Sequence, residues 1–414
     1  MNYAACIGWD WASKTHELFI REIDTGKATL VKLPHSAPEL HTWAMKMRAQ
    51  YEGRSIAVAI EGHHKAVIGA LMAYEFISIY MINPEAAANF RQSFHPSAKK
   101  DDPVDAEELC SMIERHEEKL RKFDPADAQS RLCGMLSETR RKFVEILVAL
   151  VQSLRANLET YYPQALMLAG ELDSPMAGDF LRQWPTFDKV ARSREATVAA
   201  FYAEHRSRSA KKMKERLEYI KTSYPLTNDR ALMEAGQAKT RALVEMIQTT
   251  RESIAKLEKE IKAAFDAHEK VDVIRSLPGL GDALGPRVAA IVTADPMRFQ
   301  SAEELQQITG VAPIRRQTGK RKVQVLRRSR RPVFVHQTMV EWAGASLAFC
   351  PWAKAFYDLQ KLGGHGHFSV LRKLAYKWIR ILYRCLQTGT LYDETIHQAS
   401  LKKRGSPVAL KLAA

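Results

Sequence analysis

Cysteine is scarce in this 414-residue sequence, and its few copies are scattered. The five cysteines form no CxxC pair; they are Cys6, Cys110, Cys133, Cys350 and Cys385. This pattern excludes a disulfide framework and a clustered zinc site, and it predicts a protein of the reducing cytoplasm. No apolar run approaches the roughly 18 residues of a membrane-spanning helix. The amino terminus also lacks the basic and then apolar layout of a signal peptide, so we expect no membrane partner.

Acidic residues are missing from one long stretch near the carboxyl end. The chain has 62 Lys and Arg against 47 Asp and Glu, a net charge of +15, yet residues 305–340 contain no acid. Residues 305–414 carry 20 basic against 4 acidic residues, and residues 1–110 carry 11 against 14. A block this basic repels itself without a polyanion, so we predict phosphate binding, with a solvated basic face or a localisation-type patch as the alternative. The predicted nucleic-acid-binding residues of the block are Arg315, Arg316, Lys320, Arg321, Lys322, Arg327, Arg328, Arg330 and Arg331.

The front of the chain alternates strand-like and helix-like segments. Hydrophobic residues make up 46% of the sequence and charged residues 26%, which excludes wholesale disorder. Three strands followed by helices that alternate with strands predict an α/β layer fold. The predicted strands are residues 3–8, 16–23, 29–33, 55–60 and 76–82, and the predicted helices are residues 37–51 and 65–74.

The middle of the chain is predicted to be helical. Apolar residues at helix spacing occupy residues 141–154, and residues 193–221 are basic with only weak periodicity. A heptad seam follows, with alternating steps of four and three residues. Its members are Leu243, Ile247, Thr250, Ile254, Leu257, Ile261 and Ala264. We interpret the seam as an oligomerising coiled coil; the alternative is one amphipathic helix packed on its own domain.

A Pro-Gly-x-Gly turn at residues 278–281 precedes an apolar helix at residues 284–292. Such a turn leaves backbone N–H groups open at the start of a helix, where phosphate can dock. We therefore predict that Gly279 and Gly281 contact the DNA backbone in the style of a helix-hairpin-helix. A plain helix-capping turn is the alternative.

Four acidic residues stand where a metal-dependent nuclease needs them. Asp10 ends the first predicted strand, and Glu61 ends a later one. Asp102 and Asp105, three residues apart at a helix start, project in one direction. Mg²⁺ prefers oxygen ligands, and paired ions need several carboxylates, so Mg²⁺ is the predicted cofactor. Each acid also has a plainer interpretation, as a helix cap, a dipole partner or a solvated strand end.

Several segments together resemble a known family. The DEDD motif of the insertion-sequence family 110 transposases, also described as bridge-RNA-guided recombinases, is similar to Gly8-Trp9-Asp10, Glu61-Gly62, Ile82-Asn83-Pro84 and Lys100-Asp101-Asp102-Pro103-Val104-Asp105-Ala106. The family's C-terminal transposase domain is similar to Leu277-Pro278-Gly279-Leu280-Gly281 and Gly310-Val311-Ala312-Pro313. The resemblance covers nearly the whole chain, in the right order.

The resemblance implies a domain plan and a set of site residues. It implies a RuvC-like DEDD nuclease domain of RNase H fold in residues 1–125, a helical and coiled-coil region in 126–270, a mainly α-helical transposase domain in 271–388 and a tail in 389–414. It assigns the metal ligands to Asp10, Glu61, Asp102 and Asp105. The family's nucleophilic serine falls on Thr318, a departure whose methyl group crowds the attack, and Ser329 is the fallback.

The resemblance also implies an activity and partners. The activity is Mg²⁺-dependent DNA strand cleavage and exchange through a covalent hydroxyl–phosphate intermediate. The partners are donor and target DNA, a structured noncoding RNA that pairs with both, and further copies of the chain in a dimer or an active tetramer. We expect a cytoplasmic, nucleoid-associated protein. Two alternatives stay open: a RuvC-type junction nuclease that attacks with water, and a nucleic-acid-binding protein without catalysis.

Overall fold

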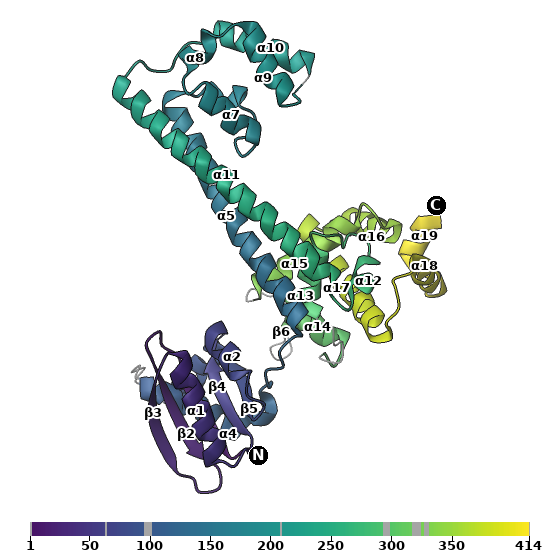
Figure 1. Ribbon diagram of the computed structural model, residues 1–414. Helices are drawn as coiled ribbons and strands as arrows, with labels where there is room; N and C mark the ends of the chain where they lie inside the picture. Colours follow the sequence, from purple (N-terminus) through teal and green to yellow (C-terminus); the bar gives the residue numbers. More distant parts are fainter. Residues whose placement is uncertain are drawn as a thin grey trace. The chain divides into compact units, whose positions relative to one another are not determined.

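The computed structural model divides the chain into two compact units, Met1–Pro125 and Ala126–Ala414. It describes residues 2–62, 64–94, 102–207, 209–292, 299–316, 324–326 and 331–413. The first unit combines a sheet with helices, and the second is almost entirely helical (Figure 1). Among the described helices, none is both long enough and apolar enough to cross a membrane.

The first unit is built on a five-stranded mixed sheet, as the alternating pattern predicted. Its strands are β1 (Ala5–Asp10), β2 (Thr15–Glu22), β3 (Ala28–Pro34), β4 (Ile56–Glu61) and β5 (Ile77–Ile82). The spatial order is β3-β2-β1-β4-β5. β1, β2 and β3 are antiparallel neighbours, whereas β4 and β5 run parallel to β1. The helices are α1 (Ala37–Gln50), α2 (Lys65–Leu71), α3 (Pro84–Phe94) and α4 (Asp102–His116), followed by the short 3₁₀ helix η1 (Glu117–Lys119).

In β1 and β4, the two faces of the sheet carry side chains of different size. Large residues such as Ile7, Trp9 and Ile60 point to one face, where they form a core with residues of α1 and α2. Small residues of β1 and β4 point to the other face, where Cys6, Ala57 and Ala59 pack with residues of α4. The small face lets α4 lie unusually close to the sheet.

Gly8 sets the distance between β1 and α4. A β-carbon at this position would overlap the carbonyl oxygen of Ala106 and lie 2.6 Å from the backbone nitrogen of Cys110. The same close approach allows the Cys110 thiol to donate to the carbonyl oxygen of Cys6 at 3.2 Å. Glycine is therefore required at position 8 because two backbones meet there.

We expect Gly8→Ala to destabilise the first unit by about 3 kcal/mol, because the added methyl forces α4 off the sheet. Urea unfolding of the full chain checks this, since the transition of the first unit should move to lower urea. Gly69→Ala is the matched control. Gly69 lies in α2 with open space around it, so that substitution should stabilise the helix slightly. Equal midpoints for both variants would contradict the expectation.

The second unit is organised around two long antiparallel helices, α5 (Ala128–Tyr161) and α11 (Arg230–Asp266) (Figure 1). Hydrogen bonds join them along their length. Gln129 Nε2 donates to the Ala264 carbonyl at 2.7 Å near one end, and Asn157 Nδ2 donates to the Gly236 carbonyl at 2.9 Å near the other. A short ion pair between Arg140 and Glu258, 2.6 Å, lies between them.

The heptad seam of α11 packs against another helix of the same chain. This differs from our interpretation of the seam as an oligomerising surface. Leu243, Ile247, Ile254 and Ile261 are buried, and α11 packs chiefly against α5. The physical reason is that α5 is much longer than the 141–154 helix we predicted. It supplies a tethered antiparallel partner for the seam, so no second protomer is needed to cover it.

Short helices gather at the end of the α5–α11 pair where Tyr161 lies (Figure 1). They are α6 (Ala165–Leu168), α7 (Pro175–Gln183), α8 (Phe187–Ala191), α9 (Glu195–Glu204) and α10 (Ala210–Thr222). Phe180, Phe201 and Tyr202 form a common core with Leu158 of α5 and Val244 of α11. This helical group is therefore part of the second unit.

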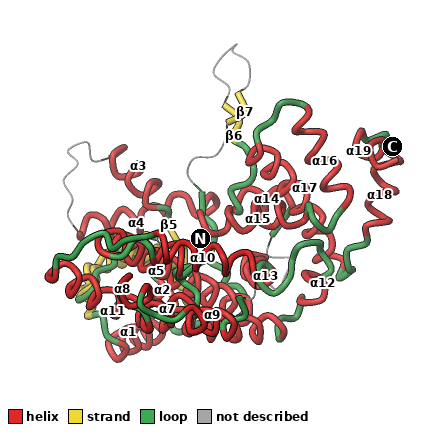
Figure 2. Tube along the Cα trace, turned by 90° about the horizontal axis from the view of Figure 1, so that it is seen from above, coloured by secondary structure: helices red, strands yellow, loops and turns green. Residues whose placement is uncertain are grey.

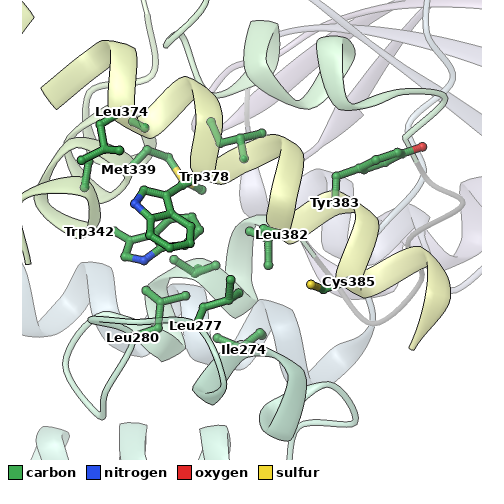
Figure 3. Close-up of a cluster of buried hydrophobic side chains, with 14 of the residues drawn as sticks. Ile274, Leu277, Leu280, Met339, Trp342, Leu374, Trp378, Leu382, Tyr383 and Cys385 are labelled. Atoms are coloured by element: carbon green, nitrogen blue, oxygen red, sulfur yellow. The ribbon is translucent and has the colours of Figure 1, made fainter. Parts of the chain in front are cut away.

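The remaining helices surround a core rich in tryptophan. They are α12 (Val271–Arg275), α13 (Gly285–Val292), α14 (Ala302–Ile308), α15 (Val333–Ser346), α16 (Pro351–Leu362), α17 (His367–Thr388), α18 (Glu394–Lys403) and α19 (Pro407–Ala413). Trp378 packs between Trp342 and Trp352, with ring centroids 5.5 and 4.8 Å away. Figure 3 shows Trp342 and Trp378 together within this core. Two short strands, β6 (Ile314–Arg316) and β7 (Gln324–Leu326), pair beside these helices (Figure 2).

Candidate active site

Asp10 and Glu61 lie at the carboxyl ends of two adjacent parallel strands. Trp9 of β1 is level with Ile60 of β4, and each acid is the next and last residue of its strand. Trp9 and Ile60 are fully buried, whereas Asp10 and Glu61 are half-buried at the edge of the core. The sheet therefore brings the two carboxylates to one edge because the register of parallel neighbours aligns their ends.

Asp105 reaches the same edge from α4. Ala106, the next residue, is the one whose carbonyl oxygen lies against Gly8, two residues before Asp10. Asp105 is 4% exposed. Asp102 is the first residue of α4, and its side chain lies outside the described residues.

The three described carboxylates line one cavity of about 330 Å³ within the first unit. The structure thus brings together three of the four predicted ligands, which stand 95 positions apart in the sequence at the extremes. The other residues that line the cavity are Trp11, His64, Pro84, Ala88 and Arg91.

Arg91 of α3 lies in the cavity, and sequence reasoning missed it. Its Nε atom is 2.9 Å from Asp105 Oδ1, and the two side chains are 19% and 5% exposed. A carboxylate this deeply buried is costly without a positive partner, so the guanidinium stabilises the charged form of Asp105. The sequence carries no signal for this contact, because α3 reaches the cavity only when it packs against α4.

The cavity has the chemistry of a divalent-cation site, although its donors are not gathered around a common point. Three carboxylates form an oxygen donor set of the kind that Mg²⁺ prefers. Within the described ranges, however, no three His, Cys, Asp or Glu side chains lie close enough together to hold one ion. Asp105 is instead paired with Arg91. The cavity therefore offers the oxygen ligands that a divalent ion prefers. The positive charge next to Asp105 comes from the side chain of Arg91.

A stacked pair of rings forms one wall of the cavity. The rings of Trp11 and His64 are 4.3 Å apart and inclined by 11°. Beyond them, His16 is fully buried, and its Nε2 lies 3.0 Å from His35 Nδ1. Burial, followed by the nearby His35 and His64, lowers the pKa of His16 to about 4, so this ring is neutral at pH 7. Trp11 directly follows Asp10, which is the one sequence signal that could have placed it here.

Thr318 and Ser329, the candidate nucleophile and its fallback, lie outside the described residues. So do Lys320, Arg321, Lys322, Arg327, Arg328 and Arg330. The backbone of Arg315 and Arg316 forms β6, where Arg315 pairs with Val325 of β7. Arg331 is half-buried, close to Gly310. The phosphate-binding role of this basic block stays a prediction.

The Pro-Gly-x-Gly turn is held by contacts inside the second unit. The indole N–H of Trp342 donates to the carbonyl oxygen of Pro278 at 3.0 Å. Gly279 has a φ of 85°, and a β-carbon there would lie 2.9 Å from the backbone nitrogen of Ser346. Packing and backbone conformation both favour glycine at position 279. Gly281 is exposed, with open space around it. The contact of Gly279 and Gly281 with DNA stays a prediction.

Comparison with known proteins accounts for most of the chain. A transposase sequence model of the IS110 DEDD type matches residues 7–163, and the model described as the transposase IS116/IS110/IS902 family matches residues 271–358. A protein of Streptomyces coelicolor described as the mini-circle transposase for IS117 is 31% identical over 398 residues, which cover 94% of this chain and 95% of that protein. The chain belongs to the IS110 family of transposases. An IS110-family transposase acts on DNA, so DNA is a substrate of this chain.

Other relatives match shorter parts of this IS110-family transposase. A transposase of Sinorhizobium fredii, y4uE, is 32% identical over 211 residues, which cover 49% of this chain and 56% of that protein. The 43.6 kDa protein of insertion element IS110 from Streptomyces coelicolor is 28% identical over 157 residues, 37% of each chain. Residues 164–270 lie outside both family models.

Proposed function

We propose that this transposase catalyses Mg²⁺-dependent DNA strand cleavage and exchange through a covalent hydroxyl–phosphate intermediate. The observation that carries the proposal is the single cavity shared by Asp10, Glu61 and Asp105. Three carboxylates from two strand ends and a helix are unfavourable together unless positive charge is supplied. A divalent ion would supply that positive charge, and a nuclease uses such an ion to cleave phosphodiesters.

The first unit is, on this proposal, a RuvC-like domain of RNase H fold. An antiparallel run β3-β2-β1 extended by parallel β4 and β5 supports this assignment. The carboxylates at the ends of β1 and β4, with α4 packed across β1, support it further. The site lies at the carboxyl edge of the central strands, where acidic groups can face a ligand without breaking the core.

Asp10, Glu61, Asp102 and Asp105 are the residues that would hold Mg²⁺. When bound, the ion stabilises negative charge that develops on phosphate and on the leaving oxygen. Arg91 supplies a fixed positive charge in the same cavity, and the stacked Trp11 and His64 rings also line it.

The nucleophile on this proposal is the hydroxyl of Thr318. Its oxygen bonds to phosphorus and loses its proton, while the bond from phosphorus to the leaving strand breaks and that strand ends in a hydroxyl. The new phosphoester keeps the energy of the old one, so a second strand hydroxyl can reverse the reaction and no ATP is needed.

A water-attacking junction nuclease is the second candidate. The described residues that line the cavity supply carboxylates, and carboxylates that hold a divalent ion also suit the activation of water. On this candidate water is the attacking group, and the carboxylates serve hydrolysis rather than strand exchange.

A cleavage assay with end-labelled DNA, with and without Mg²⁺, separates these candidates. We expect label to become covalently attached to protein only when Mg²⁺ is present. Free hydrolysed ends would instead support the nuclease, and binding without cleavage would leave a nucleic-acid-binding protein. Boiling in detergent before electrophoresis provides the control that the attachment is covalent.

The proposed partners are a structured noncoding RNA that selects donor and target DNA, and further copies of the chain. Delegating recognition to base pairing fits a sequence without a zinc finger or any recognisable sequence-reading helix. The α11 seam already packs against α5 within the chain. RNA transcribed from DNA that flanks the reading frame should co-purify with the protein, and its absence would count against guidance.

A further inference from the structure

The helices α8, α9 and α10 form a basic surface that the family models leave unexplained, since they lie within residues 164–270. Residues 187–222 contain ten Lys and Arg against five Asp and Glu. That is a net charge of +5 in 36 residues, compared with +15 in the whole chain. We call the exposed bases of this region the basic tip; they are Lys189, Arg192, Arg194, Arg206, Lys211, Lys212 and Lys214.

The three helices of the tip pack together, so its bases lie on one small body. α10 contacts α8, and Lys221 of α10 is 2.6 Å from Glu195 at the start of α9. That pair shows that α9 and α10 are antiparallel, which puts the start of α10 beside the end of α9. In the part of the chain that the structure describes, none of the seven bases forms an ion pair. Their positive charge is therefore not neutralised by ion pairs within the described part of the protein.

The start of α10 concentrates the positive charge. The sequence from residue 205 to residue 214 contains no acid. Ser209 caps α10 by accepting from the backbone N–H of Lys212 at 3.4 Å, and the first turn contains no acidic side chain. Lys211 and Lys212 thus stand at the positive end of the helix dipole, where an anion, rather than a cation, is favoured. The arrangement is unfavourable for the isolated helix and becomes favourable when a polyanion binds.

The turn before α10 is held in place by a buried arginine. Arg216, 8% exposed, stacks on the Tyr202 ring at 3.9 Å and donates to Ser207 Oγ at 3.0 Å. Arg206, the residue before Ser207, has a φ of 57°, a conformation that glycine or asparagine adopts more easily.

We propose that the basic tip binds the phosphate backbone of nucleic acid, as a second contact surface of this transposase. Unpaired lysines and arginines on a rigid helical body give sequence-independent contacts of the kind that release counterions from nucleic acid. The surface is independent of the carboxylate cavity, because it lies in the other unit and needs no metal.

Binding of the full-length protein to a DNA duplex and to an RNA hairpin, over a series of salt concentrations in EDTA, tests this. The test variant is Lys211→Gln with Lys212→Gln and Lys214→Gln. The control is Lys239→Gln with Lys256→Gln and Lys259→Gln, three exposed lysines of α11 that lie outside the tip. Both variants lose the same charge, so the comparison separates the tip from net charge.

We expect the tip variant to bind about tenfold more weakly at low salt and to lose about two units of the log–log salt slope for DNA, while the control changes little. A loss on RNA alone would support the tip as an RNA contact, and a loss on DNA alone as a DNA contact. Equal behaviour of the two variants would overturn the proposal. Binding is measured in EDTA, which removes Mg²⁺. The binding result can therefore be interpreted even if the proposed catalysis proves wrong.

Two controls test whether the variants lose binding because they misfold. The tip variant removes positive charge from the positive end of α10, so its melting temperature should not fall below that of the wild type. A second variant, Arg192→Gln with Arg194→Gln, alters the turn between α8 and α9 and leaves α10 intact. It should also weaken binding, and unchanged binding of both tip variants would overturn the proposal.

Discussion

Asp10→Asn should reduce strand cleavage by more than about 100-fold, because it removes one negatively charged donor from the cavity that Glu61 and Asp105 share. Asparagine keeps the shape of the side chain, so β1 and its pairing with β4 should be unaffected. Nucleic-acid binding should stay within about twofold of the wild type, since the phosphate-binding residues that we predict are basic and lie elsewhere. Cleavage of labelled DNA in Mg²⁺ and binding in EDTA measure the two effects separately.

Asp24→Asn is the matched control for this experiment. Asp24 is an exposed acid of the same unit, paired with Arg54 at 2.6 Å outside the carboxylate cavity. The same loss of charge there should leave cleavage near the wild-type rate. If Asp10→Asn still cleaves, Asp10 must be removed from the set of ligands, and if both variants fail, a general effect of charge or stability is the cause.

Thr318→Ala should abolish the covalent attachment of DNA to protein, because no oxygen remains at that position to bond to phosphorus. Thr318→Ser should preserve the attachment or increase it, since serine keeps the hydroxyl and lacks the methyl group that crowds the attack. Gel electrophoresis of labelled DNA after denaturation measures the amount of protein-linked label.

Ser329→Ala is the control, because this residue is a second hydroxyl in the same basic block. It should leave the attachment intact. Attachment that survives Thr318→Ala and disappears in Ser329→Ala would transfer the role of nucleophile to Ser329. Hydrolysis without attachment in every variant, including the wild type, would favour the water-attacking nuclease.

Local pattern was enough to predict the strands of the first unit. Alternating and β-branched runs indicated five strands, and five strands form its sheet. The seam of α11 was recognised for the same reason, as a heptad repeat. Its partner was not, because a repeat specifies that a face will be buried and carries no information about which helix covers it. The answer was α5, a helix of 34 residues of which the pattern had indicated less than half.

Some residues of the candidate site could be predicted from the sequence, and others could not. Strand ends and a helix start were visible in the sequence as the positions of Asp10, Glu61 and Asp105. Arg91 was not, because its contact with Asp105 depends on how α3 and α4 pack. Gly279 also packs against the end of α15, a contact that the sequence did not indicate, and its phosphate contact stays a prediction.

The sequence by itself determined the five strands of the first unit, the heptad face of α11, where the positive charge lies and which acids end strands. These are local properties that follow from the period of apolar residues and from simple counts. Only the tertiary structure decided that three of these acids share one cavity, that arginine balances one of them and that the heptad seam faces inward. Those outcomes depend on contacts between residues far apart in the chain, and Gly8 illustrates the reason: a missing side chain lets two backbones meet.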